Sequence, residues 1–354
     1  MTNREHIKKL MDHLQTESNR EIHFDEDSIM AAYEEKDNNH QSLSIKILSI
    51  IGGMMACLTF LGFIFLFQVF DSPTGAGILG VICIAGSSLI SRISGKTIID
   101  TLSVSFFITG FALLGFALST EGDSVYMVFI VFALCTLFLV QSYILSFISV
   151  LIINGSIVAF SQTHDTYSLI SAIIIFQTVI ITFLFLQEAK IITKNKILSK
   201  LYDPVRAGMV FSFIFTLVFS GLASFLHLTE HYYDWIPSVV IMLAILYVVF
   251  LLFRTLKVTS TTYKIIIYTL TVLFLLPTLL TPTISGAVLI ILLSFFVNYR
   301  TGLVLAIIAL IYFIGRFYYD LGFTLLIKSI LLFGSGISFL AIYFFTHKKL
   351  TANE

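Results

Sequence analysis

The amino-acid sequence predicts an all-α fold, a bundle of about twelve membrane-spanning helices with both termini in the cytoplasm. Three observations support this fold class. First, 57 % of the 354 residues are hydrophobic, only 12 % are charged, and the mean hydropathy is +0.96. This is more apolar surface than a water-soluble domain can bury. Second, long apolar runs recur along the chain. Third, Lys and Arg gather in every second segment that connects these runs.

The apolar runs are long enough for transmembrane helices, which need about 20 residues to cross a bilayer. The second and tenth runs are short, and only Gln141 and Ser142 separate the fourth from the fifth. Ten or eleven spans are therefore alternatives to twelve. The expected spans, in order, are 46–68, 75–91, 98–119, 124–141, 143–161, 166–187, 205–226, 236–253, 264–281, 283–298, 301–317 and 322–346.

The charges of the connecting segments predict the orientation, because Lys and Arg accumulate in short cytoplasmic loops. With twelve spans and a cytoplasmic amino terminus, Arg316 is the only base among the outer segments. The bases assigned to the inner side are Arg92, Lys96, Lys190, Lys194, Lys196, Lys200, Arg206, Arg254, Lys257, Lys264, Arg300, Lys348 and Lys349. The acids assigned to the outer side are Asp71, Glu121, Asp123, Asp165, Glu230, Asp234 and Asp320. We therefore expect both termini in the cytoplasm.

The first 44 residues form an acidic arm with ten acids and five bases. Thr2-x-x-Glu5 resembles a capping box, and Ile7, Leu10 and Leu14 recur at helical spacing, which predicts a short amphipathic helix. The arm either docks on the membrane domain or on a partner, or it is a loosely ordered acidic tail. Because this polar stretch is far longer than a signal-peptide n-region, we expect the first apolar run to be a mature anchor.

A basic segment between the sixth and seventh spans divides the helices into two sets of six. Its lysines alternate with Ile and Leu, so we expect it to lie along the inner membrane surface, attracted to anionic lipid. The predicted organisation is an arm at 1–44, a first bundle at 45–188, a basic connector at 189–204, a second bundle at 205–346 and a cytoplasmic tail at 347–354.

Two motifs are better explained by membrane structure than by a cofactor or metal site. Gly75-Ala-Gly77-Ile-Leu-Gly80 matches GxGxxG, but no strand precedes it, so we expect these small residues to let two helices pack closely. His227-Leu-Thr-Glu230-His231 has the HxxEH order of inverted zinc peptidases, but it lies in an outer loop beside aromatic residues. A looser metal contact on the outer face, formed by His164, Asp165, His227 and His231, is an alternative. We therefore predict no cofactor, no metal site and no catalytic residue.

Several polar residues lie in or near the spans. Asp100 and Glu188 are close to cytoplasmic ends, where a carboxylate stays hydrated, whereas Asn154 and Gln177 lie deeper. Hydrogen bonds between helices are the usual role of such amides. A polar path through the membrane is the functional alternative.

The stretch from Arg316 to Ser329 contains the other candidate residues. Arg316 and Asp320 are four residues apart and can pair if the eleventh helix extends that far. Lys328 lies roughly 10 Å into the last helix at 1.5 Å per residue. A lysine at that depth costs on the order of 2 kcal/mol unless it reaches the headgroups or finds a partner. Snorkelling, a buried contact with another span, and a role with a substrate or ion all remain open.

The same stretch carries a family resemblance. Phe317-Tyr318-Tyr319-Asp320 followed by Leu321-Gly-Phe-Thr-Leu-Leu-Ile-Lys328-Ser329 resembles the carboxy-terminal signature of the domain of unknown function 4401 family, which comprises bacterial polytopic membrane proteins. The specific likeness covers the last quarter of the chain. It implies location in the bacterial inner membrane and a role as a subunit of a membrane assembly, because members are often encoded beside another multi-span protein. It carries over no catalytic residue or substrate.

Three classes of function follow. The first is a non-enzymatic subunit of a membrane or envelope assembly. Its expected partners are the lipid bilayer and another multi-span membrane protein, and no nucleic acid is expected to bind. The alternative is a secondary transporter for a small solute, with a polar path near Lys328. An intramembrane enzyme is the weakest hypothesis, because no acids or His/Cys pairs cluster at one depth. The sequence leaves the oligomeric state open.

Overall fold

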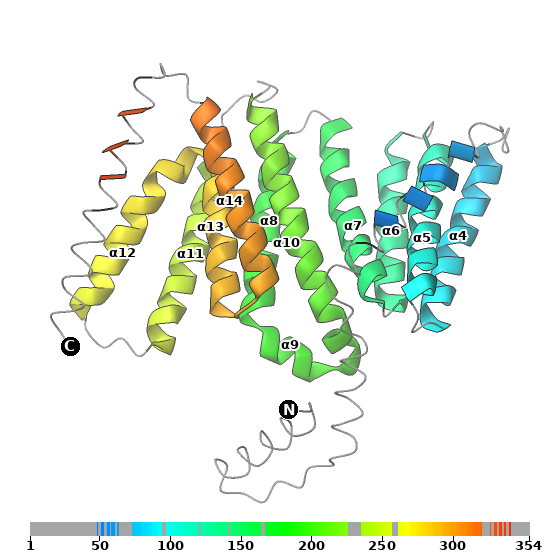
Figure 1. The fold of residues 1–354 in the computed structure, drawn as a ribbon, viewed down its shortest axis with the longest axis horizontal. Helices are drawn as coiled ribbons and strands as arrows, with labels where there is room; N and C mark the ends of the chain where they lie inside the picture. Colours follow the sequence, from blue (N-terminus) through cyan, green and yellow to red (C-terminus); the bar gives the residue numbers. More distant parts are fainter. Residues whose placement is uncertain are drawn as a thin grey trace, which may run out of the picture. The chain divides into compact units, whose positions relative to one another are not determined.

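The computed structural model describes residues 73–93, 97–119, 122–140, 142–163, 167–225, 235–256 and 261–320, with isolated positions in 48–63 and 326–340. In these ranges the regular structure is helical, which confirms the all-α fold class (Figure 1). The helices are α4 (Pro73–Ile93), α5 (Thr97–Ala117), α6 (Ser124–Leu139), α7 (Tyr143–Thr163), α8 (Tyr167–Leu186), α9 (Glu188–Lys194), α10 (Lys196–Phe225), α11 (Trp235–Thr255), α12 (Thr261–Leu275), the 3₁₀ helix η1 (Leu276–Leu280), α13 (Pro282–Phe296) and α14 (Arg300–Asp320).

The helices have the length and composition of membrane spans. Six of those in the described ranges are long and apolar enough to cross a bilayer, and shorter apolar helices lie at Leu102–Ala117, Ser124–Leu139, Lys264–Leu279 and Pro282–Phe296. Each of these helices overlaps one of the apolar runs in the sequence, although the candidate span on α10 begins at Lys196, before the expected start at 205. The protein is therefore embedded in a membrane. The expected first and last spans fall mainly outside the described residues, so the total of twelve stays a prediction.

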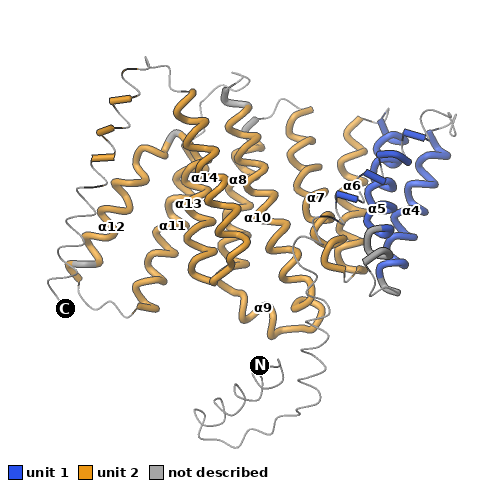
Figure 2. The backbone as a smooth tube through the Cα atoms, viewed as in Figure 1, with its two compact units in different colours: residues 1–120 blue, residues 121–354 orange. Residues whose placement is uncertain are grey.

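The chain forms two compact units, residues 1–120 and 121–354 (Figure 2). In the first unit α4 packs against α5 through glycines. A Cβ built on Gly80 would lie 2.8 Å from the carbonyl oxygen of Gly110, which is closer than real Cβ contacts. The Ser103 hydroxyl donates to the Ser87 carbonyl at 2.6 Å. This confirms the prediction that the Gly75–Gly80 stretch allows close helix packing.

The core of the second unit surrounds α10, which contacts α7, α8, α9, α13 and α14. Two glycines permit the closest of these approaches. A Cβ on Gly208 would lie 2.8 Å from Val150 Cβ of α7, and one on Gly286 of α13 would lie 2.5 Å from Leu217 Cδ1 of α10. Inside a lipid bilayer the hydrophobic effect does not drive helices together, so van der Waals contact at such glycines contributes to their association. The division into two sets of six helices stays a prediction.

The basic connector is helical. α9 follows α8 after a single turn residue at Gln187, and Asn195, in an extended conformation, separates α9 from α10. α10 then continues from Lys196 through Pro204 into the membrane-spanning part. Proline has no N–H to donate and disfavours a regular helix, so the helix at this point needs support from its neighbours. The side chains that surround this stretch form the candidate site.

Candidate functional site

Arg206 is the charged residue that the described part of the chain buries, with 8 % of its surface exposed. It lies on α10, half a turn after Pro204. A charge removed from water is costly unless it is paired and hydrogen-bonded. Charged, hydrogen-bonding and aromatic groups around Arg206 must therefore stabilise its buried charge.

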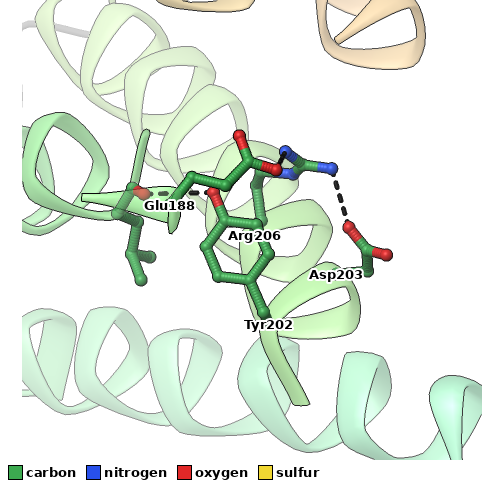
Figure 3. Close-up of polar contacts among 5 residues, drawn as sticks. Glu188, Tyr202, Asp203 and Arg206 are labelled. Atoms are coloured by element: carbon green, nitrogen blue, oxygen red, sulfur yellow. Dashed lines mark hydrogen bonds and ion pairs between the residues drawn. The ribbon is translucent and has the colours of Figure 1, made fainter. Parts of the chain in front are cut away.

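Two carboxylates neutralise the guanidinium (Figure 3). Nη1 donates to Glu188 Oε1 at 3.1 Å, and Nη2 donates to Asp203 Oδ1 at 2.7 Å. Glu188 opens α9, and Asp203 lies one turn before Arg206 on α10. Their side chains are 28 % and 65 % exposed, so Glu188 is the more sheltered partner. The Glu188 pair ties the beginning of α9 to α10.

Aromatic rings surround the same guanidinium. Arg206 Cζ lies 4.1 Å from the ring centroid of Tyr299, 4.9 Å from that of Tyr202 and 5.9 Å from that of Phe185. A cation within about 6 Å of a ring face is attracted by its quadrupole, and most strongly where water is excluded. The Tyr202 hydroxyl donates to the Leu184 carbonyl at 3.0 Å, in the last turn of α8 (Figure 3). Helix-end carbonyls need such donors.

Tyr299 reaches Arg206 because of the way α13 ends. Asn298 has a left-handed φ of 57°, its N–H donates to Phe295 O at 3.2 Å, and the Tyr299 N–H donates to Ser294 O at 2.8 Å. These bonds form a Schellman motif with asparagine at the left-handed position. The ring then packs over Gly302 of α14, where a Cβ would lie 2.4 Å from Tyr299 Cδ1. The turn and the glycine together determine the position of this ring.

Tyr299 is neutral at physiological pH. Burial raises the pKa of its phenol to about 12, with Tyr143 and Asp203 acting in the same direction and Arg206 against them. A neutral ring keeps the electron-rich face that attracts Arg206. We call the group of interacting side chains around this guanidinium the Arg206 cluster; it consists of Glu188, Tyr202, Asp203, Arg206 and Tyr299. The cluster joins α8, α9, α10 and the turn between α13 and α14.

A second polar contact joins two residues that the sequence singled out. Gln177 Nε2 of α8 donates to Asn154 Oδ1 of α7 at 3.0 Å, and Asn154 Nδ2 donates to the Val150 carbonyl at 2.8 Å. Asn154 Nδ2 also lies 3.7 Å from Met209 Sδ of α10. Gln177 is 1 % exposed, and among the described residues its Oε1 has no hydrogen-bond partner. The pair links three helices inside the unit.

The structure describes the side chains of three of the other candidate residues. Arg316, Tyr318 and Tyr319 occupy the last turns of α14, where the two tyrosine rings meet edge to face at 5.6 Å between centroids. Asp320 ends α14, so the helix does extend as far as a pair with Arg316 requires, but its side chain lies outside the described set, as does that of Asp100 on α5. Lys328 lies outside the described residues.

The HxxEH motif, His227 to His231, and His164 also lie outside the described residues. In the part of the chain that the structure describes, no group of three or more His, Cys, Asp or Glu side chains could hold a metal ion. The predictions about metal and cofactors therefore stay predictions.

A groove of about 350 Å³ lies between α8 and α11. Its two threonine hydroxyls, from Thr178 and Thr182, both donate to carbonyls of their own helix at 2.7 Å. The remaining lining residues are mostly apolar: Val179, Phe183, Leu186, Val240, Ala244, with Gln187 and Tyr247. Such a lining suits hydrocarbon better than a polar solute.

The sequence interpretation missed the Arg206 cluster. It counted Arg206 among the loop cations that set orientation and treated Glu188 as a hydrated carboxylate. A usable signal was Asp203-Pro204-Val205-Arg206, an acid and a base three apart at the start of an apolar run. If the segment is helical through Pro204, that spacing brings the two side chains together at the edge of the membrane.

The comparison with protein families extends the resemblance found at the carboxy terminus. The family profile described as Domain of unknown function (DUF4401) matches residues 42–349. The chain belongs to this family. No curated protein and no solved structure matches it. The DUF4401 region includes both the Arg206 cluster and the Asn154–Gln177 pair, so both lie within the family domain.

Proposed function

We propose that this DUF4401 protein is a non-enzymatic subunit of a membrane or envelope assembly in the bacterial inner membrane. The observation that carries the proposal is the Arg206 cluster. Its two carboxylates pair with the one guanidinium at 3.1 and 2.7 Å, and its rings pack against that guanidinium, so these groups join helices. A bundle stiffened in this way is suited to present a fixed surface to a partner.

The surface of the second unit supports the same proposal. Large apolar side chains such as Phe176, Leu243 and Ile308 are exposed on α8, α11 and α14. In a membrane these side chains face lipid or another multi-span protein. Association within a bilayer requires close packing and adds few polar contacts. The resemblance at the carboxy terminus implies a multi-span partner of this kind.

The bacterial inner membrane and a cytoplasmic amino terminus are part of the proposal. The bases that flank the described helices support it. Arg254 lies in the last turn of α11, Arg300 begins α14, and the lysines of the connector lie on α9 and the start of α10. In the predicted topology all of these positions are on one side of the membrane, as the enrichment of Lys and Arg in cytoplasmic loops requires.

The experiment that tests the proposal is purification of the full-length tagged chain from its native membrane in mild detergent, with identification of associated proteins by mass spectrometry. We expect another membrane protein at a stoichiometric level. An unrelated multi-span protein that carries the same tag, from the same strain, is the matched control. If the chain elutes alone or as a homodimer, and chemical cross-linking in intact cells also captures no other membrane protein, the subunit proposal is wrong.

The alternative, a secondary transporter for a small solute, is favoured by the Asn154–Gln177 pair, because buried amides in spans also occur along transport paths. The second residue for this hypothesis is Lys328. A deletion strain complemented with variants and grown in competition over many nutrients tests it. If the protein transports, Gln177→Met and Lys328→Met lose complementation at parental protein levels, while Lys328→Arg retains part of it. Full complementation by both Met variants excludes a path through these residues.

A further inference from the structure

The connector presents a surface of lysines in the described structure. Lys190 and Lys194 lie on α9, and Lys196 and Lys200 lie on the first turns of α10. All four are exposed. Within the described ranges none of them forms an ion pair, because the adjacent acids Glu188 and Asp203 both bind Arg206. We call these four residues the lysine surface; among the described residues, no carboxylate pairs with any of its four charges.

Apolar side chains lie between these lysines. Ile192, Ile197 and Leu198 are all exposed on the same two helical segments. In Figure 1, α9 lies at the lower ends of α8 and α10, where the apolar spans end. A surface of exposed Ile and Leu mixed with Lys, placed at the end of spans, fits the boundary between acyl chains and headgroups. The lysine stems cover apolar surface there while their ammonium groups reach the headgroups.

The Arg206 cluster fixes the position of this surface. The ion pair between Glu188 and Arg206 holds the beginning of α9 against α10, and the Tyr202 hydroxyl holds the end of α8. The segment that bears the lysines is therefore anchored at both of its ends. An anchored set of cations loses less conformational entropy on binding an anion than a mobile loop does.

We propose that the lysine surface binds the phosphate groups of anionic phospholipids in the leaflet that it faces. The charge requires an anionic partner, and the exposed Ile and Leu side chains require that this partner also offers hydrocarbon. An anionic phospholipid supplies both. This inference does not depend on the subunit proposal, because a transporter would present the same surface.

The experiment reconstitutes the purified full-length chain in vesicles of equal amounts of phosphatidylglycerol and phosphatidylcholine. The protein is then extracted in mild detergent, and the lipids that remain bound are counted by mass spectrometry. We expect the parent to retain phosphatidylglycerol over phosphatidylcholine, and high salt during extraction to reduce this preference. Lys190→Gln with Lys194→Gln should lower the preference about fivefold or more.

A matched variant removes two cations elsewhere on the same predicted side. Arg254→Gln with Arg300→Gln replaces two exposed bases that lie outside the lysine surface, and it should keep most of the preference. Lys190→Arg with Lys194→Arg should keep it as well. If the glutamine pair fails to fold, Lys196→Gln with Lys200→Gln tests the same surface.

Two results overturn the proposal. One is equal loss of preference in the arginine control and the lysine variants, which would indicate a diffuse charge effect. The other is a parent that retains both lipids equally, which would mean that another acidic partner, such as the acidic residues 1–44 of the chain itself, covers the lysines.

Discussion

Replacement of Arg206 by methionine tests whether the Arg206 cluster holds the helices together. Methionine keeps an apolar, flexible side chain of similar length but removes the charge. Glu188, whose side chain is 28 % exposed, then loses its partner at 3.1 Å, and Tyr299 loses the cation 4.1 Å above its ring. We expect the protein to become less stable to unfolding.

The magnitude follows from the exposure of each partner. Breaking a fully buried pair costs about 3–5 kcal/mol, but Glu188 retains some contact with water, so its share is smaller. Asp203 is 65 % exposed, and its pair contributes at most about 1 kcal/mol. The contact with Tyr299 adds up to about 2 kcal/mol. We therefore expect a loss of about 2–4 kcal/mol for Arg206→Met.

The assay is reversible unfolding of the full-length protein in mixed micelles by increasing the fraction of SDS, followed by circular dichroism. Asp203→Asn is the matched control, because it removes the exposed pair alone and should cost less than about 1 kcal/mol. A double-mutant cycle between Arg206→Met and Glu188→Gln should give a larger coupling energy than the cycle with Asp203→Asn. The reasoning is refuted if Arg206→Met unfolds within about 0.5 kcal/mol of the parent, or if the two coupling energies are equal.

Three further predictions concern Tyr299 and the turn that positions it. Gly302→Ala should destabilise the protein by about 1–3 kcal/mol in the same assay, because the new Cβ would lie 2.4 Å from Tyr299 Cδ1. The control is Gly315→Ala, also on α14. No atom lies within 4 Å of the Cβ position of Gly315, so this substitution should have little effect or stabilise slightly. Asn298→Val should lower the free energy of unfolding by about 1–2 kcal/mol and Asn298→Gly should hardly change it, because φ is 57° at this position. Equal losses of stability in the two variants would contradict the role of the left-handed turn. The pKa of Tyr299 is raised to about 12 in the folded state, so the neutral phenol's contribution to folding stability is fully present below the ordinary value near 10 and is lost as the pH rises toward 12. Between pH 10 and 12, the free energy of unfolding should therefore fall more steeply in the parent than in Tyr299→Phe. Parallel curves of stability against pH would disprove the shift.

The sequence alone predicted most of the helices. α4 to α8, α11, α13 and α14 each coincide with an expected apolar run, because the bilayer requires about 20 apolar residues in succession and this is a property of a single segment. The close packing at Gly80 was predictable for a similar reason, since small residues in a span indicate a helix contact. The family resemblance at the carboxy terminus was confirmed over residues 42–349.

The polar contacts were less predictable. The amides Asn154 and Gln177 stood out because they lie deep in apolar runs, but hydropathy does not say which face of a helix meets which neighbour. That they bind each other follows from the packing of α7 against α8 and α10. Lys328, a candidate residue of the sequence analysis, lies outside the described residues.

The sequence by itself therefore determined which segments enter the membrane, because that depends on composition along the chain. Only the tertiary structure decided which of the positive residues near the membrane edge is buried in ion pairs and which are exposed. Arg206 and the lysines of the connector look alike as positive residues between two spans. Helix packing buries Arg206 among Glu188, Tyr202 and Tyr299, which come from three different elements, and leaves the lysines exposed. The difference arises from contacts between residues far apart in the chain, which no local pattern contains.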